Sequence, residues 1–183
     1  MTEPESAKPP QSVKDDWIGS ALSRYEGPLL RYASRFLGLE QARDVVQDTF
    51  LRLCRENPAR LDGHLGQWLF TVCRNRARDV LRKEGRLTEL DEAREPASPA
   101  PAAPRVLEGK EALRDVLRVL ATLPASQQEV LRLKFQEELS YQEISVVTGR
   151  TVSHVGVLIH SGLKAIRSQL GEPARAAQLR RVR

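Results

Sequence analysis

Residues 71–86 carry the side chains best suited to bind a polyanion. This segment holds six basic and two acidic residues, a net charge of +4, whereas the whole chain carries +5. Arginine forks and asparagine amides are the usual ligands of phosphates and base edges. A helix over this segment would gather most of these groups on one face, with a solvated charge-rich helix as the plainer alternative. The DNA-facing residues predicted here are Thr71, Arg74, Asn75, Arg78, Arg82, Lys83 and Arg86.

Two aromatic residues, Trp68 and Phe70, directly precede this basic segment. Such side chains can stack on an unpaired base or wedge beside one. Core packing is the alternative interpretation for both. The position of the pair next to the basic segment favours a surface for single-stranded nucleic acid.

An earlier segment, 40–56, predicts a helix with two different faces. Ala42, Val45, Val46, Thr49, Phe50 and Leu53 form a core stripe on one side. The opposite face holds Asp44, Gln47, Asp48 and Leu51, at the helical spacing i, i+3, i+4 and i+7. A leucine beside two acids and an amide indicates a surface that binds another protein, and a solvated acidic face is the alternative.

The segment 140–170 has the pattern of a helix-turn-helix. Ser140 is expected to cap a short helix, Gly149 to lie in the turn, and Thr151 or Ser153 to open a longer helix. The start of that second helix normally enters a major groove, where Val155 or Leu158 could touch thymine methyl groups. The alternative is that this apolar half packs elsewhere. The predicted DNA-facing residues are Tyr141, Arg150, Thr151, Ser153, His154, Val155 and Leu158, with Lys164 and Arg167 at phosphates.

No pattern for catalysis is present in the sequence. It has no glycine-rich phosphate loop, no cluster with metal-ligand spacing, and no nucleophile with a base at a meaningful distance. The three histidines, His64, His154 and His160, are interpreted as non-catalytic. We therefore expect no enzyme activity, no metal and no cofactor. Cys54 and Cys73 are expected to be buried, reduced thiols.

No segment alternates as a strand does, so the predicted fold class is all-α. Two small helical bundles joined by a flexible linker are expected, the second containing the helix-turn-helix. Helices are predicted over 15–38 with a break at Gly27-Pro28, then 40–56, 67–84, 109–123, 126–135 with a Ser126 cap, 141–147 and 151–170.

The composition of the chain divides it into five parts. The predicted division is a disordered tail at 1–13, a helical domain at 14–87, a Pro/Ala-rich linker at 88–107, a helix-turn-helix domain at 108–170 and a basic tail at 171–183. No secretory signal and no apolar run of about 18 residues is present, so we expect a cytoplasmic protein without membrane insertion.

The motifs resemble those of bacterial sigma factors of the extracytoplasmic-function (ECF) type. The second conserved region of that family is similar to three segments of this chain, LLRYASRFLG, ARDVVQDTFLRL and GQWLFTVCRNRARDVLRKEGR. The fourth region is similar to LATLPASQQEVLRLKFQEELSYQEISVVTGRTVSHVGVLIHSGLKAIRSQL. The resemblance covers about 130 residues, in the order that the family has.

The resemblance implies a transcription initiation factor that directs core RNA polymerase to promoters. It implies that Asp44, Gln47, Asp48, Phe50 and Leu51 bind the clamp helices of the largest polymerase subunit. The 14–87 domain would melt and read the minus-ten element with the basic segment, Trp68 and Phe70. The loop that includes Leu61 and His64 would hold a flipped base. The 108–170 domain would dock on the minus-thirty-five element and on the flap of the second-largest subunit, and an anti-sigma protein is a further partner that the resemblance allows.

One departure concerns the second helix of the helix-turn-helix. Family members typically carry Lys and several Arg there, whereas this chain has Gly156, Leu158, Ser161 and Leu163. Conventional reading of the minus-thirty-five element is therefore in question. Three alternatives remain: a stand-alone helix-turn-helix regulator, a protein that captures polymerase or a sigma inhibitor without initiating transcription, and, more distantly, an RNA-processing enzyme.

Overall fold

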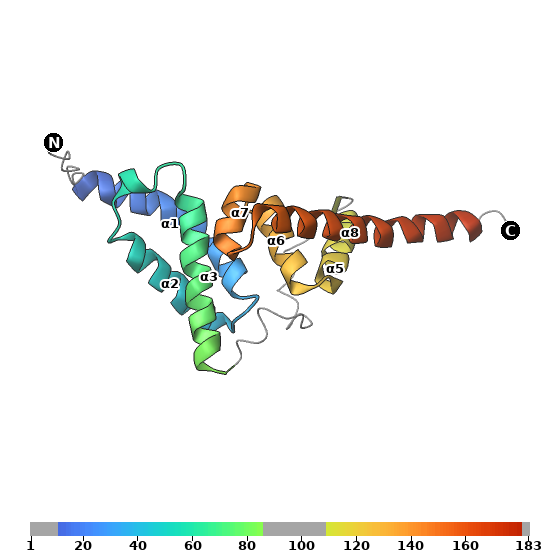
Figure 1. Ribbon diagram of the computed structural model, residues 1–183, viewed down its shortest axis with the longest axis horizontal. Coiled ribbons are helices and arrows are strands. Elements are labelled where there is room, and N and C mark those ends of the chain that lie inside the picture. Colours follow the sequence, from blue (N-terminus) through green and yellow to red (C-terminus); the bar gives the residue numbers. More distant parts are fainter. Residues whose placement is uncertain (1–10, 86–108, 181–183) are drawn as a thin grey trace. The chain divides into compact units, whose positions relative to one another are not determined.

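The computed structural model describes residues 11–85 and 109–180, and these form helices joined by short turns (Figure 1). The all-α prediction is therefore confirmed for the described part of the chain. Contacts divide the chain into two compact units, Met1–Lys83 and Glu84–Arg183. The predicted linker at 88–107 and Arg86 lie outside the described residues.

The first unit consists of three helices and one short 3₁₀ helix. In order these are α1 (Gln11–Ala33), α2 (Leu39–Leu53), η1 (Pro58–Arg60) and α3 (Leu65–Lys83). Each of the three α-helices packs against the other two. Phe70 lies in the centre of this core, fully buried, and its ring meets that of Tyr32 edge-on with 5.4 Å between centroids.

Helix α1 is continuous through Pro28, so the predicted break at Gly27-Pro28 is wrong. A proline inside a helix removes one backbone hydrogen bond and costs about 3 kcal/mol. Ala21 before the proline and Leu29 and Tyr32 after it are all buried. Packing of one face on both sides of Pro28 therefore keeps the helix intact, and α1 ends at Ala33, before the predicted end.

The end of α2 also differs from the prediction. The helix stops at Leu53 and not near residue 56, because Asn57 caps the following 3₁₀ helix, accepting a hydrogen bond at 3.1 Å from the Ala59 backbone N–H. Helix α3 then begins at Leu65, two residues before its predicted start. Part of the expected polar loop is thus regular structure, and the remaining irregular segment is short.

The second unit contains α5 (Gly109–Thr122), α6 (Ala125–Phe135), α7 (Tyr141–Thr148) and α8 (Val152–Arg180). Helices α5, α6 and α7 all pack on α8. A Cβ added to the buried Gly162 of α8 would lie 2.7 Å from Leu131 Cδ1 of α6. The glycine, which lowers helix propensity, therefore permits the close approach of these two helices.

The predicted short helix and turn of the helix-turn-helix are confirmed. Ser140 and Glu143 form a capping box at the start of α7, and Gly149 ends it with φ 69°. Thr151, one of two candidate caps for α8, accepts a hydrogen bond at 3.2 Å from the His154 backbone N–H.

Two other helix ends were predicted wrongly. The N-cap of α6 is Pro124, not Ser126, and the Gln128 side chain ties the preceding turn by donating to the Leu123 carbonyl at 2.8 Å. Helix α8 continues past Leu170 to Arg180. This extension runs past Gly171 and Pro173, two residues of low helix propensity, and then through Ala174, Ala176 and Ala177, which favour a helix.

Cys73 is buried as predicted, but the prediction for Cys54 is wrong, because it lies exposed just beyond the end of α2. Burial raises the pKa of Cys73 to about 12. No helix in the described ranges is long and apolar enough to cross a membrane.

The first prediction concerns the Ser140 cap. We expect Ser140→Ala to lower the unfolding free energy of the second unit by about 1 kcal/mol, because the Glu143 backbone N–H loses the side-chain hydroxyl that accepts its hydrogen bond. Denaturant unfolding followed by circular dichroism measures this change. Ser145→Ala removes an exposed hydroxyl of the same helix and should have less effect; equal effects would contradict the capping role.

The second prediction concerns the two thiols. At mildly alkaline pH an alkylating reagent should label Cys54 and spare Cys73, because the raised pKa of Cys73 keeps it protonated and the core shields it. Since unfolding removes the burial, both thiols should react in denaturant. Intact-mass measurement counts the labels, and rapid double labelling of the native protein would show that the packing around Cys73 has been misjudged.

Candidate functional site

Helix α2 separates an outward acidic face from a buried apolar face. We call Asp44, Gln47, Asp48 and Leu51 the acidic face. Asp44 and Gln47 are exposed, Leu51 keeps 53% of its surface, and Asp48 is half-buried. The residues of the predicted core stripe are all buried. The division of this helix into two faces is therefore confirmed, while its binding role stays a prediction.

Phe50 does not belong to this exposed face. Its side chain retains only 7% of its surface, because it lies on the side of α2 that packs into the unit. The expectation that it directly touches a partner is corrected by this burial. Its position supports a different contribution, which is to hold α2 so that the acidic face points outward.

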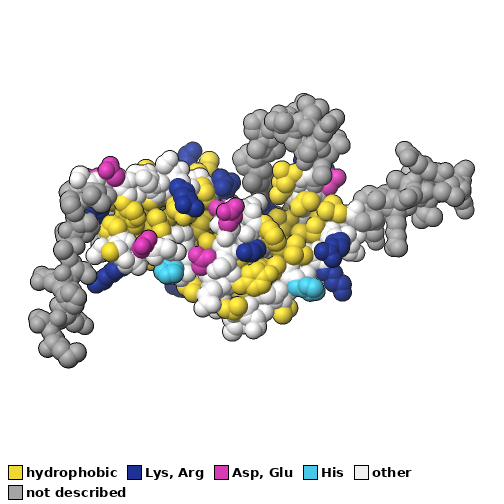
Figure 2. Space-filling model, turned by 90° about the horizontal axis from the view of Figure 1, so that it is seen from above, with side chains coloured by type: hydrophobic (Ala, Val, Ile, Leu, Met, Phe, Trp, Pro, Cys, Tyr) yellow, Lys and Arg dark blue, Asp and Glu magenta, His cyan; other side chains and the backbone are white. Residues whose placement is uncertain are grey.

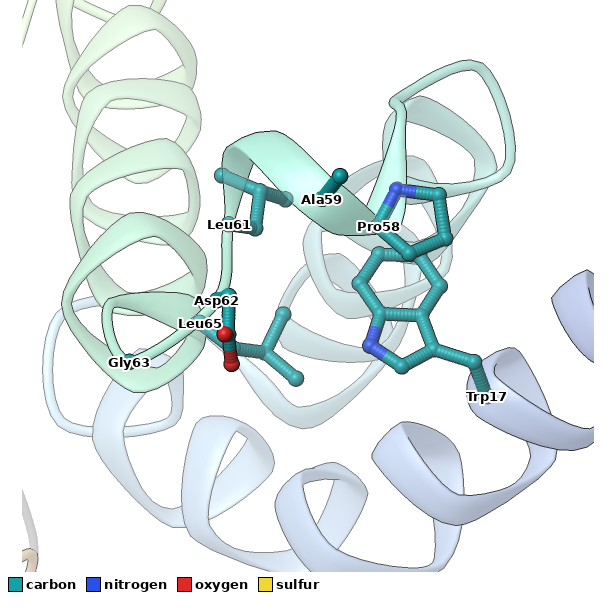
Figure 3. Close-up of a pocket in the computed structure, with 7 residues that line it drawn as sticks. All are labelled: Trp17, Pro58, Ala59, Leu61, Asp62, Gly63 and Leu65. Atoms are coloured by element: carbon teal, nitrogen blue, oxygen red, sulfur yellow. The ribbon is translucent and has the colours of Figure 1, made fainter. Parts of the chain in front are cut away.

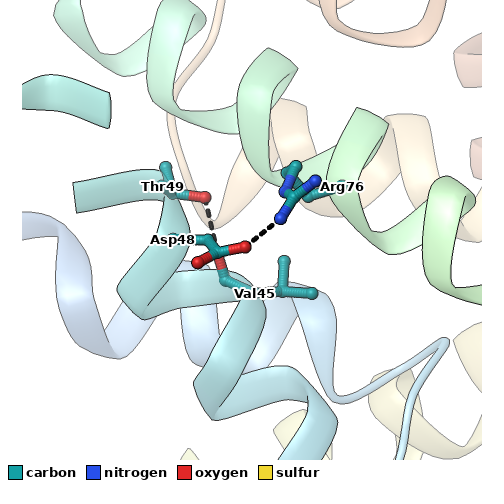
Figure 4. Close-up of polar contacts among 4 residues, drawn as sticks. All are labelled: Val45, Asp48, Thr49 and Arg76. Atoms are coloured by element: carbon teal, nitrogen blue, oxygen red, sulfur yellow. Dashed lines mark hydrogen bonds and ion pairs between the residues drawn. The ribbon is translucent and has the colours of Figure 1, made fainter. Parts of the chain in front are cut away.

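An ion pair joins the acidic face to α3 (Figure 4). Arg76 donates from Nη2 to Oδ2 of Asp48, 28 residues earlier in the chain. Both side chains are partly solvated, with 32% and 42% of their surfaces exposed, so the stability gained is small. Its consequence is positional, because the pair fixes the carboxylate of Asp48 and neutralises one arginine of the basic segment. Sequence spacing held no signal for this long-range pair.

The outward side of α3 carries fewer DNA-accessible cations than predicted. We call Thr71, Asn75, Arg78, Arg82 and Lys83 the basic face. Asn75, Arg82 and Lys83 are exposed, and Thr71 and Arg78 are half-buried. Arg82 pairs with Asp79 at 3.0 Å, one turn away on the same helix. The two charges in that pair are exposed, and solvent screens their attraction.

Two predicted DNA-facing residues of α3 are buried. Phe70 has no exposed surface and Arg74 has 3%, so neither presents its side chain to DNA. Phe70 fills the core between the helices, and Arg74 lies one turn from it, beside the buried Cys73 and Ala77. The buried face of α3 is therefore wider than its apolar stripe, and Arg74 is held by interactions inside the fold.

Three predicted residues lie around the start of α3. Trp68 is half-buried, which leaves part of the indole accessible, and His64 is exposed. The backbone carbonyl of His64 accepts from the Trp68 N–H at 2.9 Å. Leu61 is buried, with 8% of its surface exposed, so its side chain can line a pocket but does not protrude toward a partner.

A pocket of about 350 Å³ lies between this loop and α1 (Figure 3). Gly63, with φ 71°, permits the loop to turn beside it. Sequence spacing held no signal that would connect Trp17 of α1 with this loop, which lies about 40 residues later. The lining residues are Trp17, Pro58, Ala59, Leu61, Asp62, Gly63 and Leu65.

The outward surface of the second unit's helix-turn-helix also differs from the prediction. Val155 has no exposed surface and Leu158 only 9%, because α8 turns them toward α6 and α7. The expected thymine contacts by these two residues are therefore corrected. Two apolar side chains near them stay exposed, Val152 with 41% and Val157 with 64% of its surface.

The other predicted residues of this unit are accessible to different degrees. Tyr141 is exposed at 41%, with Lys134 Nζ 5.7 Å from its ring centroid, and Arg150 is half-buried. The exposed ones on and beside α8 are Thr151, Ser153, His154, Lys164 and Arg167.

No group of three or more His, Cys, Asp or Glu residues is arranged to hold a metal ion within residues 11–85 and 109–180. The surfaces described above are polar and charged faces of helices and an open pocket. Such surfaces bind macromolecules by complementary charge and shape.

Comparisons with known proteins match both units to one family. The family model described as Sigma-70 region 2 matches residues 21–87, and that of Sigma-70, region 4 matches 113–166. The RNA polymerase sigma factor CarQ of Myxococcus xanthus is 30% identical over 132 residues, 72% of this chain and 75% of CarQ.

Two further relatives carry the ECF designation in their names. The ECF RNA polymerase sigma factor SigE of Mycolicibacterium smegmatis is 29% identical over 167 residues, 88% of this chain and 64% of SigE. The ECF RNA polymerase sigma factor RpoE of Cereibacter sphaeroides is 27% identical over 131 residues, 72% of this chain and 71% of RpoE. The first unit matches region 2 and the second unit matches region 4, in the order that the family has. The chain therefore belongs to the ECF sigma factors, which are promoter-specific transcription initiation factors.

Proposed function

We propose that the first unit performs both central tasks, binding core polymerase through the acidic face of α2 and holding the unpaired minus-ten strand on the basic face of α3. The observation that carries this proposal is the packing of the two helices. Both bury one side in the same core and turn chemically opposite sides outward. A single small unit can therefore bind a protein and DNA at the same time.

The acidic face suits a basic protein surface with an apolar patch. Asp44 and Gln47 supply exposed oxygen acceptors, and Leu51 supplies exposed apolar area beside them. A central apolar residue within a polar rim is the usual anatomy of a specific interface. The clamp helices of the largest polymerase subunit are the partner that we propose for this face.

The basic face suits single-stranded DNA better than a duplex in the free protein. Asp48 neutralises Arg76 and Asp79 neutralises Arg82, so few cations remain to displace counterions from phosphates. Asn75 can bond base edges, and the accessible part of Trp68 can stack on a base. The free energy of these contacts would be gained only after strand separation, which is how binding would drive opening without nucleotide hydrolysis.

The second unit is proposed to dock upstream, on the minus-thirty-five element and the flap of the second-largest subunit. Its outward residues Thr151, Ser153 and His154 offer few bidentate contacts to bases. Lys164 and Arg167 lie further along α8, where phosphate contacts would set the register. Recognition by DNA shape would then contribute more than direct readout.

The chain is proposed to act in the cytoplasm, with polymerase, as a binding factor and not as an enzyme. A protein that only captured polymerase would share the acidic face, so initiation itself must be measured. Run-off transcription with purified core enzyme and genomic DNA, with mapped start sites, tests the proposal. Promoter-specific transcripts are expected, and their absence in the presence of stable core binding would favour capture.

The third prediction addresses the acidic face. Asp44→Ala combined with Gln47→Ala should weaken core binding about tenfold or more, because exposed acceptors at an interface are lost while the core of the unit is untouched. Binding to core polymerase is measured by fluorescence anisotropy of the labelled factor. The matched control is Glu26→Ala with Ser23→Ala, which removes one charge and one polar group from exposed positions of α1. Equal weakening by both pairs would refute the assignment.

The fourth prediction addresses the basic face. Asn75→Ala should reduce open-complex formation several-fold while core binding stays unchanged, because the exposed amide acts on separated strands. Permanganate reactivity of melted thymines reports the open complex. Gln142→Ala, which removes an exposed amide from α7 in the other unit, serves as the control. Unaltered permanganate footprints in the Asn75 variant would exclude this residue from strand capture.

A further inference from the structure

The outward side of α8 near its start has an apolar residue, Val157, at its centre. An α-helix turns about 100° per residue, so Val157 lies about 200° around the axis from the buried Val155. Because Val155 and Ile159 are packed inside the unit, Val157 is held on the outward side, with 64% of its surface exposed. On the face drawn in Figure 2, apolar side chains of this unit reach the surface beside basic ones.

Polar residues precede and follow Val157 on the same side of the helix. Ser153 lies four residues before it and Lys164 seven residues after it, spacings that place all three on one helix face, and both polar residues are exposed. Ser161, one turn after Val157, is half-buried, and its hydroxyl donates to the Val157 carbonyl at 2.8 Å. The proton of that hydroxyl is therefore used inside the helix.

The flanks of this stripe carry two imidazoles and one aromatic ring. His154 and His160 are exposed, one on each side of Val157. Tyr141 of α7 lies beside the same part of α8, because a Cβ added to Gly156 would be 3.8 Å from its Cε2 atom. The isopropyl group of Val157 thus lies between polar groups that can contact DNA, next to an aromatic ring.

An isopropyl group in the major groove can match only one kind of base edge. It makes no hydrogen bond, so placing it against a donor or an acceptor removes water from that group without replacing the bond. In the major groove the four bases present donors and acceptors, and thymine alone also presents a C5-methyl group. Burying a methyl group against an apolar side chain is favourable. Val157 therefore suits a thymine and disfavours the other bases at the position that it meets.

We propose that Val157 is a specificity-determining residue that reads the C5-methyl group of one thymine in the upstream promoter element. This inference rests on the proposed docking of the second unit on the minus-thirty-five element. It adds one direct base contact to a surface that offers few bidentate contacts. Lys164, further along the same face, would hold α8 at the phosphates while Val157 meets the base edge.

The test uses holoenzyme, assembled from core polymerase and the full chain, on duplex promoter DNA whose start site has been mapped by run-off transcription. Each thymine of the upstream element, on either strand, is replaced in turn by deoxyuridine, which lacks only the methyl group. The measured quantity is the equilibrium dissociation constant, obtained by competition. The variant is Val157→Ala, and the matched control is Val146→Ala, which shortens a valine of α7 that is 49% exposed.

The wild-type holoenzyme should bind about fourfold more weakly when deoxyuridine replaces one particular thymine, the scale expected for losing one buried methyl group. Val157→Ala should bind the natural promoter more weakly and should no longer distinguish thymine from deoxyuridine at that position. Val146→Ala should keep the wild-type pattern. Because Val157 is exposed and alanine favours a helix, the variant is expected to fold.

A second comparison isolates the methyl group from the rest of the base. At the same position, a cytosine·guanine pair is compared with a 5-methylcytosine·guanine pair. The wild-type holoenzyme should bind the methylated pair more tightly by a similar factor, and Val157→Ala should bind both pairs equally. An effect of methylation on DNA shape alone would persist in Val157→Ala and would overturn the proposed contact.

The outcomes separate this contact from the docking on which it rests. If replacing the entire upstream element leaves the binding of wild-type holoenzyme unchanged, the proposed docking fails and the contact fails with it. If the element matters but deoxyuridine has no effect at any thymine, only the reading of a methyl group by Val157 is overturned. The same holds if the deoxyuridine effect remains in Val157→Ala.

Discussion

Phe70 lies where α3 packs against the rest of the first unit, and the arrangement of the functional surfaces depends on that packing. Its fully buried ring meets Tyr32 of α1 edge-on. Burying this side of α3 fixes the rotation of the helix about its own axis. That rotation leaves Asn75 outside and takes Arg74 inside. An apolar contact thus decides which polar groups of α3 are exposed.

The ion pair between Asp48 and Arg76 joins α2, which carries the proposed polymerase-binding face, to α3, which carries the proposed DNA-binding face. Asp48 belongs to the acidic face and also neutralises Arg76 of α3. Asp79 does the same for Arg82. Because both pairs are partly solvated, each is weak and can rearrange when a stronger partner approaches. A modest net charge and internal pairing together disfavour tight binding of the free chain to DNA, whereas a complex with polymerase adds further contacts.

The second unit shows how a helix-turn-helix can keep its fold while changing its outward chemistry. Val155 and Ile159 are buried where α8 packs, and Gly162 lets α6 approach closely. The inward side therefore satisfies the packing requirements of the motif. The outward side exposes Val157 and His154. Stability and base recognition are set by different faces of one helix, so one can change without the other.

Much of this protein followed from local sequence patterns. Residue spacing and interactions within one or two helical turns determine several of its features. These are the helical class, the two faces of α2, the Ser140 cap, the Gly149 turn and the exposure of Leu51. Such interactions need no knowledge of distant residues, which is why periodicity and capping rules predict them.

Tertiary structure decided the features that depend on distant residues. Contacts between helices determine three of these features. They are the continuity of α1 through Pro28, the burial of Arg74 and Val155, and the pairing of Asp48 with Arg76. The pocket needs Trp17 and Asp62, which are 45 positions apart in the sequence, on two sides of one hollow. Helical periodicity shows which face of each helix is the most hydrophobic. It does not determine how wide the buried face is or how the helix is rotated, because the neighbouring helices set both.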